Sequence, residues 1–382
     1  MSRGCYREAQ AIPVFRSRGS SPESLPQRPT RSVTETEGRA TSVAISVVVC
    51  TYSPARMRGL VDLLGALRSQ TLPPAQIVVV VDHNPELLDR LRGSITNVTF
   101  VANSGARGLS GARNTGIDHA IGDIVAFIDD DAMPAPDLLE RHAAGYRDPA
   151  VAGVGGAVDP AWEGSSPPWF PYEFGWVVGC SYTGLPRTPS LVRNFIGCNM
   201  SFRREVFDSV GGFLTSLGRI DVVPAGCEET ELCIRLSRRL PSSKLLFDPN
   251  ASVRHAVPAA RGTWRYFRSR CYMEGRSKAR VARLVGASQA LRSERSYIVK
   301  TLPGGVVKAV SQRFKGDGAG FARAGAILAG LAFTSAGYLV GTVELWTTRR
   351  SRAVAHEMRN GESPRSAVAS AQTKRAEERV RS

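Results

Sequence analysis

Three consecutive aspartates, Asp129, Asp130 and Asp131, follow the mostly apolar run of residues 123–128. Such a run is typical of a strand buried on both faces, as in a parallel sheet. The carboxylates then emerge at the C-terminal edge of the strand, where open α/β sheets bind ligands. Because side chains alternate along an extended chain, Asp129 and Asp131 are expected to face one ligand. The pattern predicts a clamp for a hard divalent cation, with a solvated acidic turn before Pro134 as the alternative.

Polar residues also follow three other predicted strands: Thr51 and Tyr52, then Asp82, and finally His255 within the segment 253–257. The ends of parallel strands converge on one crevice, so these scattered positions are expected to form one site. Asp82 could accept hydrogen bonds from a nucleobase or a ribose, or could serve only as a turn former.

The segment Gly108–Gly116 precedes a predicted helix and is rich in small residues. Small residues allow close backbone approach, and Arg113 can reach phosphate or carboxylate oxygens through two parallel hydrogen bonds. The alternative is simple helix packing, because the segment is not a phosphate loop of the Gly-x-x-x-x-Gly-Lys-Ser type.

Strands and helices are expected to alternate from residue 45 onwards, which predicts an α/β fold with a doubly wound, mostly parallel sheet. Residues 150–227 are rich in Gly and aromatic residues and are expected to face an acceptor instead of adding another βαβ unit. The predicted strands are 45–50, 77–81, 98–102, 123–128 and 244–247, and the predicted helices are 58–69, 111–120 and 228–240.

The chain of 382 residues carries a net charge of +16, which suggests polyanionic partners such as nucleic acid, anionic lipid or sugar-nucleotide phosphates. Residues 261–323 hold fifteen Lys and Arg against three acids, so the basic charge belongs to the second half. Seven cysteines without Cys-x-x-Cys spacing indicate reduced thiols in the cytosol, and the N-terminus lacks the apolar core of a signal peptide.

The region 324–343 contains no charged residue and is long enough to cross a bilayer. Gly337 and Gly341 form a small-residue pairing motif that suits a membrane helix or a buried soluble one equally. We favour membrane association, and spanning, re-entrant and buried arrangements all remain open.

The whole chain is expected to divide into five parts. A disordered leader at 1–42 precedes a catalytic domain at 43–260, which has a nucleotide-binding half (43–135) and an acceptor half (136–260). A basic helical region at 261–323, an apolar segment at 324–346 and a charged tail at 347–382 follow.

Several motifs together resemble those of the inverting glycosyltransferases of family two, which have the GT-A fold. They occur in the family's order at residues 47–52, 78–82, 111–116, 127–134, 197–202, 211–213 and 227–236. The resemblance implies transfer of a sugar from a UDP-, GDP- or dTDP-linked donor. The residues expected to bind this donor are Thr51, Tyr52, Asp82, Arg113, Asn114, Asp129 and Asp130.

The resemblance also implies a metal held by the Asp-x-Asp motif, with Asp131 as the main ligand, Asp129 nearby and His255 as a further contact. A divalent cation stabilises the negative charge that develops on a diphosphate leaving group. Mg²⁺ or Mn²⁺ suits carboxylate and phosphate ligands. A histidine packed in the core is the alternative for His255.

Inversion requires a base that removes the proton of the acceptor hydroxyl. The family usually has Glu-Asp at the start of the helix after a Gly-Gly-Phe segment, whereas this chain has Glu228 and Glu229. Glu229 takes the position of the base, and Glu228 is the second candidate. The alternative is that the two glutamates only stabilise the start of the helix, because acids in a first helical turn interact favourably with the helix dipole.

Trp169, Trp176 and Tyr182 could stack on acceptor sugar rings or on lipid, or could pack in the core. Arg268 or Arg270 could help bind a diphosphate. The Gln-x-x-Arg-Trp motif of processive polysaccharide synthases is absent from the sequence, which favours transfer of a single sugar.

The expected acceptor is a hydroxyl on an envelope or lipid-linked glycan, at the cytoplasmic face of the cell membrane. Two other classes remain: a Mg²⁺-dependent phosphate-transfer enzyme, and a basic module that binds membrane or nucleic acid without catalysis. Nucleic acid is not expected as a partner, because the acidic cluster repels a phosphate backbone. The donor sugar, the acceptor and the oligomeric state are not encoded in these motifs.

Overall fold

The N-terminal part of the sheet is parallel and has the strand order β3-β2-β1-β4. The computed structural model describes residues 43–218, 226–286 and 292–359; the predicted leader and the end of the predicted tail lie outside them. Runs of apolar residues, mostly Val and Ile, exclude water from both faces of β1, β2 and β4, whereas the edge strand β3 is partly exposed. The elements are β1 (Ile45–Thr51), β2 (Gln76–Val81), β3 (Thr99–Ala102), β4 (Ile124–Ile128), η1 (Pro54–Arg56), α1 (Met57–Arg68), α2 (Pro85–Ser94) and α3 (Leu109–His119).

The second part of the sheet is mixed, because β8 (Asn199–Arg203) pairs antiparallel with β4 and with β6. The remaining strands are β5 (Ala132–Pro134), β6 (Val151–Trp162), β7 (Ser190–Leu191) and β9 (Lys244–Val257). The two predicted segments 244–247 and 253–257 are therefore one strand, which pairs parallel with β6 and antiparallel with β5. The predicted α/β fold class is confirmed.

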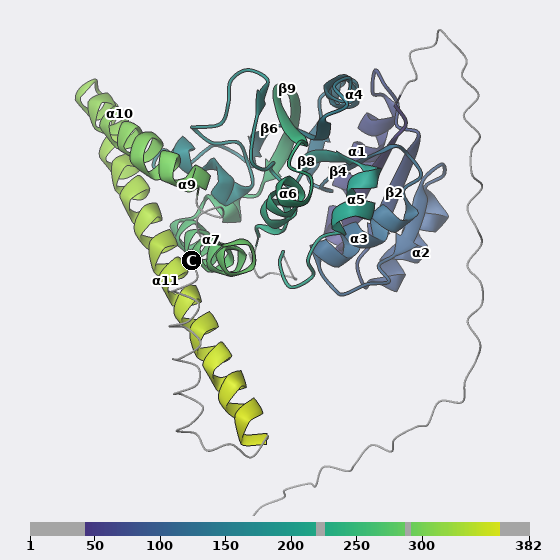
Figure 1. Ribbon diagram of the computed structural model, residues 1–382. Helices are drawn as coiled ribbons and strands as arrows, with labels where there is room; N and C mark the ends of the chain where they lie inside the picture. Colours follow the sequence, from purple (N-terminus) through teal and green to yellow (C-terminus); the bar gives the residue numbers. More distant parts are fainter. Residues whose placement is uncertain (1–42, 219–225, 287–291, 360–382) are drawn as a thin grey trace, which may run out of the picture. The chain divides into compact units, whose positions relative to one another are not determined.

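Helices cover both faces of the sheet, as Figure 1 shows. Alternate residues of β1 divide between two cores: Val47 and Val49 pack with α1 and α2, whereas Val48 packs with α3 and α6. This division follows from the two-residue period of a strand. The other elements of this region are α4 (Leu138–Gly145), α5 (Arg204–Val210), α6 (Glu228–Arg239), η2 (Tyr172–Val178) and η3 (Ala259–Gly262).

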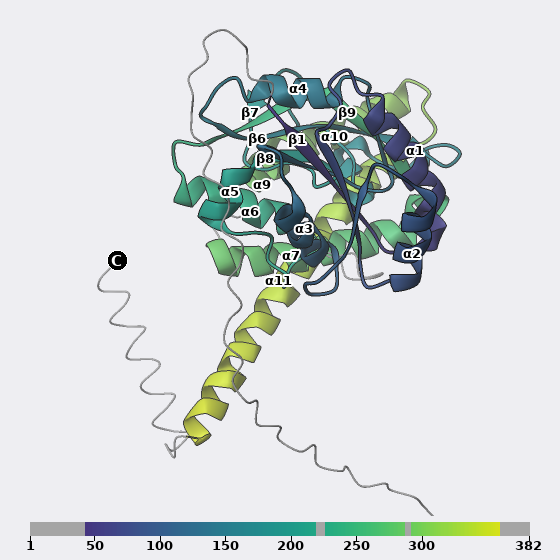
Figure 2. The same cartoon turned by 90° about the vertical axis from the view of Figure 1, so that its right-hand side faces the viewer.

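The C-terminal region is helical, and its long helix α11 lies alongside α7 in both Figure 1 and Figure 2. A Cβ at Gly337 would lie 1.9 Å from the carbonyl oxygen of Tyr272, so only glycine lets the two backbones approach this closely. The predicted apolar segment 324–346 lies within α11, which continues past the predicted start of the tail. The elements are α7 (Trp264–Val285), α9 (Arg292–Ser296), η4 (Tyr297–Thr301), α10 (Leu302–Phe314) and α11 (Gly320–Arg359).

Candidate active site

One cavity of about 560 Å³ lies at the C-terminal ends of β1, β2 and β4 and continues to the first turn of α6 and to α11. It brings together most of the side chains predicted from the sequence, although Asn114 and Trp169 are not in its lining. The predicted residues that line it are Thr51, Tyr52, Asp82, Arg113, Asp129, Asp130, Asp131, Trp176, Tyr182, Glu228, Glu229 and His255.

The carboxylate of Asp82 is fixed at the end of β2 by hydrogen bonds. The side-chain amide of Asn103 donates to Oδ1 at 2.6 Å, and the backbone N–H of Gly108 donates to Oδ2 at 2.9 Å. His83 Nδ1 also lies 2.8 Å from Oδ1, so Oδ2, with the single N–H of Gly108, is the oxygen that keeps a lone pair for a ligand. Asp82 therefore presents a pre-oriented acceptor to the cavity.

The three aspartates after β4 pair with two arginines. Asp129 accepts a hydrogen bond from Arg113 at 3.2 Å, whereas Arg56 pairs with both Asp130 and Asp131. Asp129 and Asp131 both line the cavity, and the chain turns here, with the backbone N–H of Ala132 donating to the carbonyl of Asp129. The turn is the reason that neighbouring carboxylates share a partner.

Asp130 is buried, and this burial raises its pKa to about 6 despite the nearby Arg56 guanidinium. Burial would also raise the pKa of Asp131, but the neighbouring His255 and Arg56 outweigh it and hold that pKa well below its usual range. Asp131 is therefore the aspartate of this pair that stays fully ionised at neutral pH.

The donor set of Asp131 and His255 fits a divalent cation. Their facing atoms, Oδ1 and Nε2, lie 3.2 Å apart because β5 pairs with β9, and His255 is the one polar partner that the described residues offer to the buried Asp131 Oδ1. No group of three or more His, Cys, Asp or Glu side chains suited to a metal occurs in the described parts of the chain. Mg²⁺ typically takes only one or two carboxylates and completes its shell with water and substrate phosphates.

Arg113 is buried at 1% exposure and joins the aspartates to α6. Its Nη1 donates to Glu228 Oε1 at 2.9 Å, and its Nη2 donates to the carbonyl of Gly197 at 2.9 Å as well as to Asp129. The second carboxylate oxygen of Glu228 is buried without a hydrogen-bond partner. Glu228 is thus committed to an internal ion pair.

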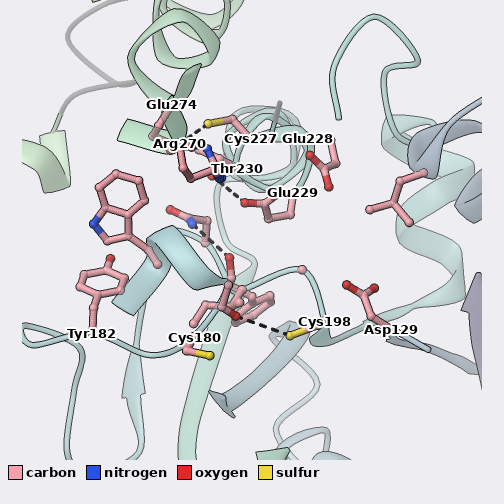
Figure 3. A pocket seen from close by; sticks show the side chains of 18 of the residues that line it. Asp129, Cys180, Tyr182, Cys198, Cys227, Glu228, Glu229, Thr230, Arg270 and Glu274 are labelled. Carbon is pink, nitrogen blue, oxygen red and sulfur yellow. Dashed lines mark hydrogen bonds and ion pairs between the residues drawn. The ribbon is translucent and has the colours of Figure 1, made fainter. Parts of the chain in front are cut away.

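Glu229 is half-buried in the cavity wall, where its carboxylate contacts the hydroxyl of Thr230. Burial and the adjacent charge of Glu228 raise the pKa of Glu229 to about 8, although Arg113 opposes this effect. A carboxylate with a raised pKa is a stronger base. In Figure 3, Glu229 lies between Asp129 on one side and Arg270 and Tyr182 on the other.

The predicted acceptor residues separate in the structure. Trp176 and Tyr182 line the cavity and both contact Tyr297, whereas Trp169 packs against Trp264 and Phe267 outside it. Asn114 also does not line the cavity. Its side chain bonds to the N–H and the carbonyl of Phe213 and thereby fixes the chain before α6.

Several cavity residues were missed by sequence reasoning, although Arg270, one of two suggested arginines, is among the lining residues. Arg56 follows the first strand closely, and this position is the only signal that could have revealed it. The others lie on segments whose packing is not marked by a local motif. They include Arg193, Arg261, Glu274, Lys278, Glu294 and Tyr297.

Known proteins share much of this sequence, and the shared part identifies its family. Residues 46–211 match the model of glycosyl transferase family 2. A glucosyl-dolichyl phosphate glucuronosyltransferase of Haloferax volcanii is 37% identical over 238 residues, covering 61% of this chain and 76% of the relative. The succinoglycan biosynthesis protein ExoM of Rhizobium meliloti is 27% identical over 246 residues, covering 62% and 74%.

Among solved structures, a mannosyltransferase from Pyrobaculum calidifontis in complex with GDP-Man and Mn²⁺ is similar at 19% identity and a TM-score of 0.49, over 77% of this chain and 88% of that one. The family assignment depends on the match to the family model and on the Haloferax relative, most of whose length the chain covers. These findings confirm the resemblance inferred from the motifs, and the chain belongs to the family-two glycosyltransferases.

Proposed function

We propose that this glycosyltransferase moves a single sugar from a nucleoside diphosphate sugar to a hydroxyl of a glycan, with inversion at the anomeric carbon. One observation carries the proposal: a single cavity is lined by the strand-end acids Asp82 and Asp129 and also by Glu229 on α6. The acids provide a place for the donor, and Glu229 provides a base beside it.

At the donor end, we assign the nucleoside to Asp82 and the diphosphate to the region of Asp129 and Asp131. The charged residues Arg56 and Arg261 lie beside Asp131, at 2.9 and 3.8 Å from its Oδ2. Asp131 and His255 would hold Mg²⁺ or Mn²⁺, which when bound supplies positive charge to the leaving diphosphate. Arginine side chains can add bidentate contacts to phosphate oxygens.

The chemistry is a direct displacement. The acceptor oxygen forms a bond to the anomeric carbon while the bond from that carbon to the diphosphate oxygen breaks, and the leaving diphosphate keeps the electron pair. The proton of the acceptor hydroxyl passes to the carboxylate of Glu229. Glu228 holds Arg113 through its internal ion pair and so keeps α6 in place beside the donor.

We propose a lipid-linked glycan as the acceptor, at the cytoplasmic face of the membrane. The name of the Haloferax relative gives a dolichyl phosphate sugar as its own substrate, which supports this choice. One helix in the described residues, Gly320–Thr347 within α11, is long and apolar enough to cross a membrane. We infer that this helix contacts the bilayer.

A thermal-shift screen of UDP-, GDP- and dTDP-linked sugars, with and without Mn²⁺, tests the donor proposal. We expect at least one of them to raise the melting temperature, and to raise it further with Mn²⁺, because a ligand that binds only the folded state stabilises it. The stabilising donor is then used in a transfer assay with a glycan acceptor. The absence of metal-dependent stabilisation by any of them would overturn the proposal.

A further inference from the structure

The far end of the cavity contains five charged residues that the proposed sugar transfer does not use. We call them the cationic cluster; they are Arg193, Arg270, Lys278, Glu274 and Glu294. Arg270 Nη1 lies 2.8 Å from Glu274, Lys278 Nζ lies 2.7 Å from Glu294, and Arg193 makes two bonds to Glu294 at 2.8 and 3.0 Å.

The cationic cluster has an excess of positive charge. Burial would raise the pKa of Glu274 and of Glu294, but the nearby cations outweigh it and bring both to about 2. Both acids are therefore ionised at neutral pH, and three cations face two carboxylates. Each cation has a carboxylate partner, and the described residues of the cluster together carry one more positive than negative charge, so this end of the cavity favours an anionic ligand.

The donor end has the opposite balance. Asp82 and the three aspartates after β4, together with Glu228, outnumber the neighbouring arginines, whereas the cationic cluster is positive. Glu229 lies between these two ends, as Figure 3 shows. The two ends therefore suit ligands of different charge, with the base between them.

The same cavity also has an apolar wall, part of which is exposed. It is formed by Phe174 and Leu302, which are buried, and by Leu331 of α11. Ile298 and Leu339 also line the cavity but are 43% and 65% exposed, so they stand at its mouth. A ligand here would have an anionic head and a hydrocarbon tail.

We propose that Arg270 and Lys278 bind the phosphate of an acceptor carried on a long alkyl or isoprenyl chain, and that the chain leaves the cavity between η4 and α11. This inference deepens the proposed function and rests on it for its catalytic meaning. A sugar attached to a phosphate at the cationic cluster presents its ring hydroxyls to Glu229. Trp176 flanks this sugar, because its ring lies 5.9 Å from the Arg270 guanidinium.

Binding of dodecyl phosphate to the full chain, below its micelle concentration and without any nucleotide sugar, tests the subsite. We expect saturable binding of dodecyl phosphate by calorimetry, with a dissociation constant about tenfold or more below that of inorganic phosphate. Dodecyl maltoside has the same tail without charge and is expected not to bind. Arg270→Gln and Lys278→Gln are each expected to weaken it about tenfold or more, as for the loss of a charge-assisted hydrogen bond.

Two further variants separate binding from folding. Arg280→Gln removes a charge from an exposed position of the same helix and is expected to bind dodecyl phosphate normally. Leu339→Trp, at the exposed mouth, is expected to weaken the binding of dodecyl phosphate but not the binding of inorganic phosphate. Unchanged dodecyl phosphate binding in both Arg270→Gln and Lys278→Gln would overturn the subsite. If dodecyl phosphate binds as expected but no nucleotide sugar does, the subsite stands and the proposed sugar transfer fails.

Discussion

Arg113 and Glu228 form an ion pair that is closed to solvent, with Nη1 of the arginine 2.9 Å from Oε1 of the glutamate. The same guanidinium reaches Asp129 through Nη2 at 3.2 Å. A single side chain therefore touches both Asp129, at the end of β4, and the first turn of the helix that carries Glu229. This contact sets the separation between the two.

Arg113→Gln is expected to destabilise the protein by about 3–5 kcal/mol, because it leaves Glu228 buried without a compensating charge. Glu228→Gln is expected to cost less, since Arg113 keeps Asp129 and the carbonyl of Gly197 as partners. Urea unfolding of the two variants measures the difference. A larger loss for Glu228→Gln would contradict this account of the pair.

Glu229→Gln is expected to lower the rate of transfer by about 10²–10⁴-fold, the range for loss of a general base. The amide cannot take the proton, but it preserves the shape of the site, so donor affinity should stay the same. Steady-state transfer and donor binding are measured in the purified variant. Glu205→Gln, at an exposed position of α5, serves as the control. Unchanged turnover would remove Glu229 from the mechanism.

The rate of transfer should rise with pH up to about 8 and then level off. The pKa of Glu229 is raised to about 8 by burial and by Glu228, with Arg113 opposing and Glu274 adding to the rise. Only the ionised form accepts a proton, so below this value the rate should fall about tenfold per pH unit. The residual activity of Glu229→Gln should not fall in this way below pH 8. A rate of transfer that is constant between pH 6 and 8 in the unmodified enzyme would refute the assignment of Glu229 as the base.

Asp131→Asn should abolish the extra stabilisation of the donor complex by Mn²⁺. The amide keeps the size of the side chain but removes the charge that a hard cation prefers. Thermal shift with donor, with and without Mn²⁺, gives the comparison. Asp118→Asn, at an exposed position on α3, should behave like the unmodified enzyme. Retention of the full Mn²⁺ effect in Asp131→Asn would rule out this ligand.

Gly337→Val should loosen α11 from α7, because the new Cβ would meet the carbonyl oxygen of Tyr272 at 1.9 Å. Overpacking of this kind typically costs about 1–3 kcal/mol. Limited proteolysis and the melting temperature should both report the change. A Cβ at Gly325 of the same helix meets no atom within 4 Å, so Gly325→Ala should have no such effect. Equal behaviour of the two variants would argue against close packing at Gly337.

The meeting of the strand-end residues in one cavity could be predicted, because these residues follow strands with clear patterns. Runs of Val and Ile mark the buried strands, and parallel strands bring Thr51, Asp82 and Asp129 to one edge. The sharing of Arg56 by Asp130 and Asp131 could not be predicted, because it depends on a turn directly after β4. Alternation holds only while the chain stays extended.

The aromatic lining of the cavity could be predicted only in part. Trp169 and Trp176 are the same residue type in one aromatic segment, yet only Trp176 lines the cavity. Which of them does so depends on packing against distant residues, Tyr297 for Trp176 and Trp264 for Trp169. The raised pKa of Glu229 likewise arises from burial by the folded chain, which no local pattern expresses.

The close packing of α11 on α7 means that the cavity is not contained within the region that carries the family motifs. Leu331, Tyr338 and Leu339 line the cavity although they lie more than 100 residues beyond the end of the family match at residue 211. A chain shortened before α11 would keep every residue assigned to the donor and would lose one wall of the acceptor side. Under the proposed function, changes in these C-terminal helices would alter the choice of acceptor and leave the donor chemistry intact.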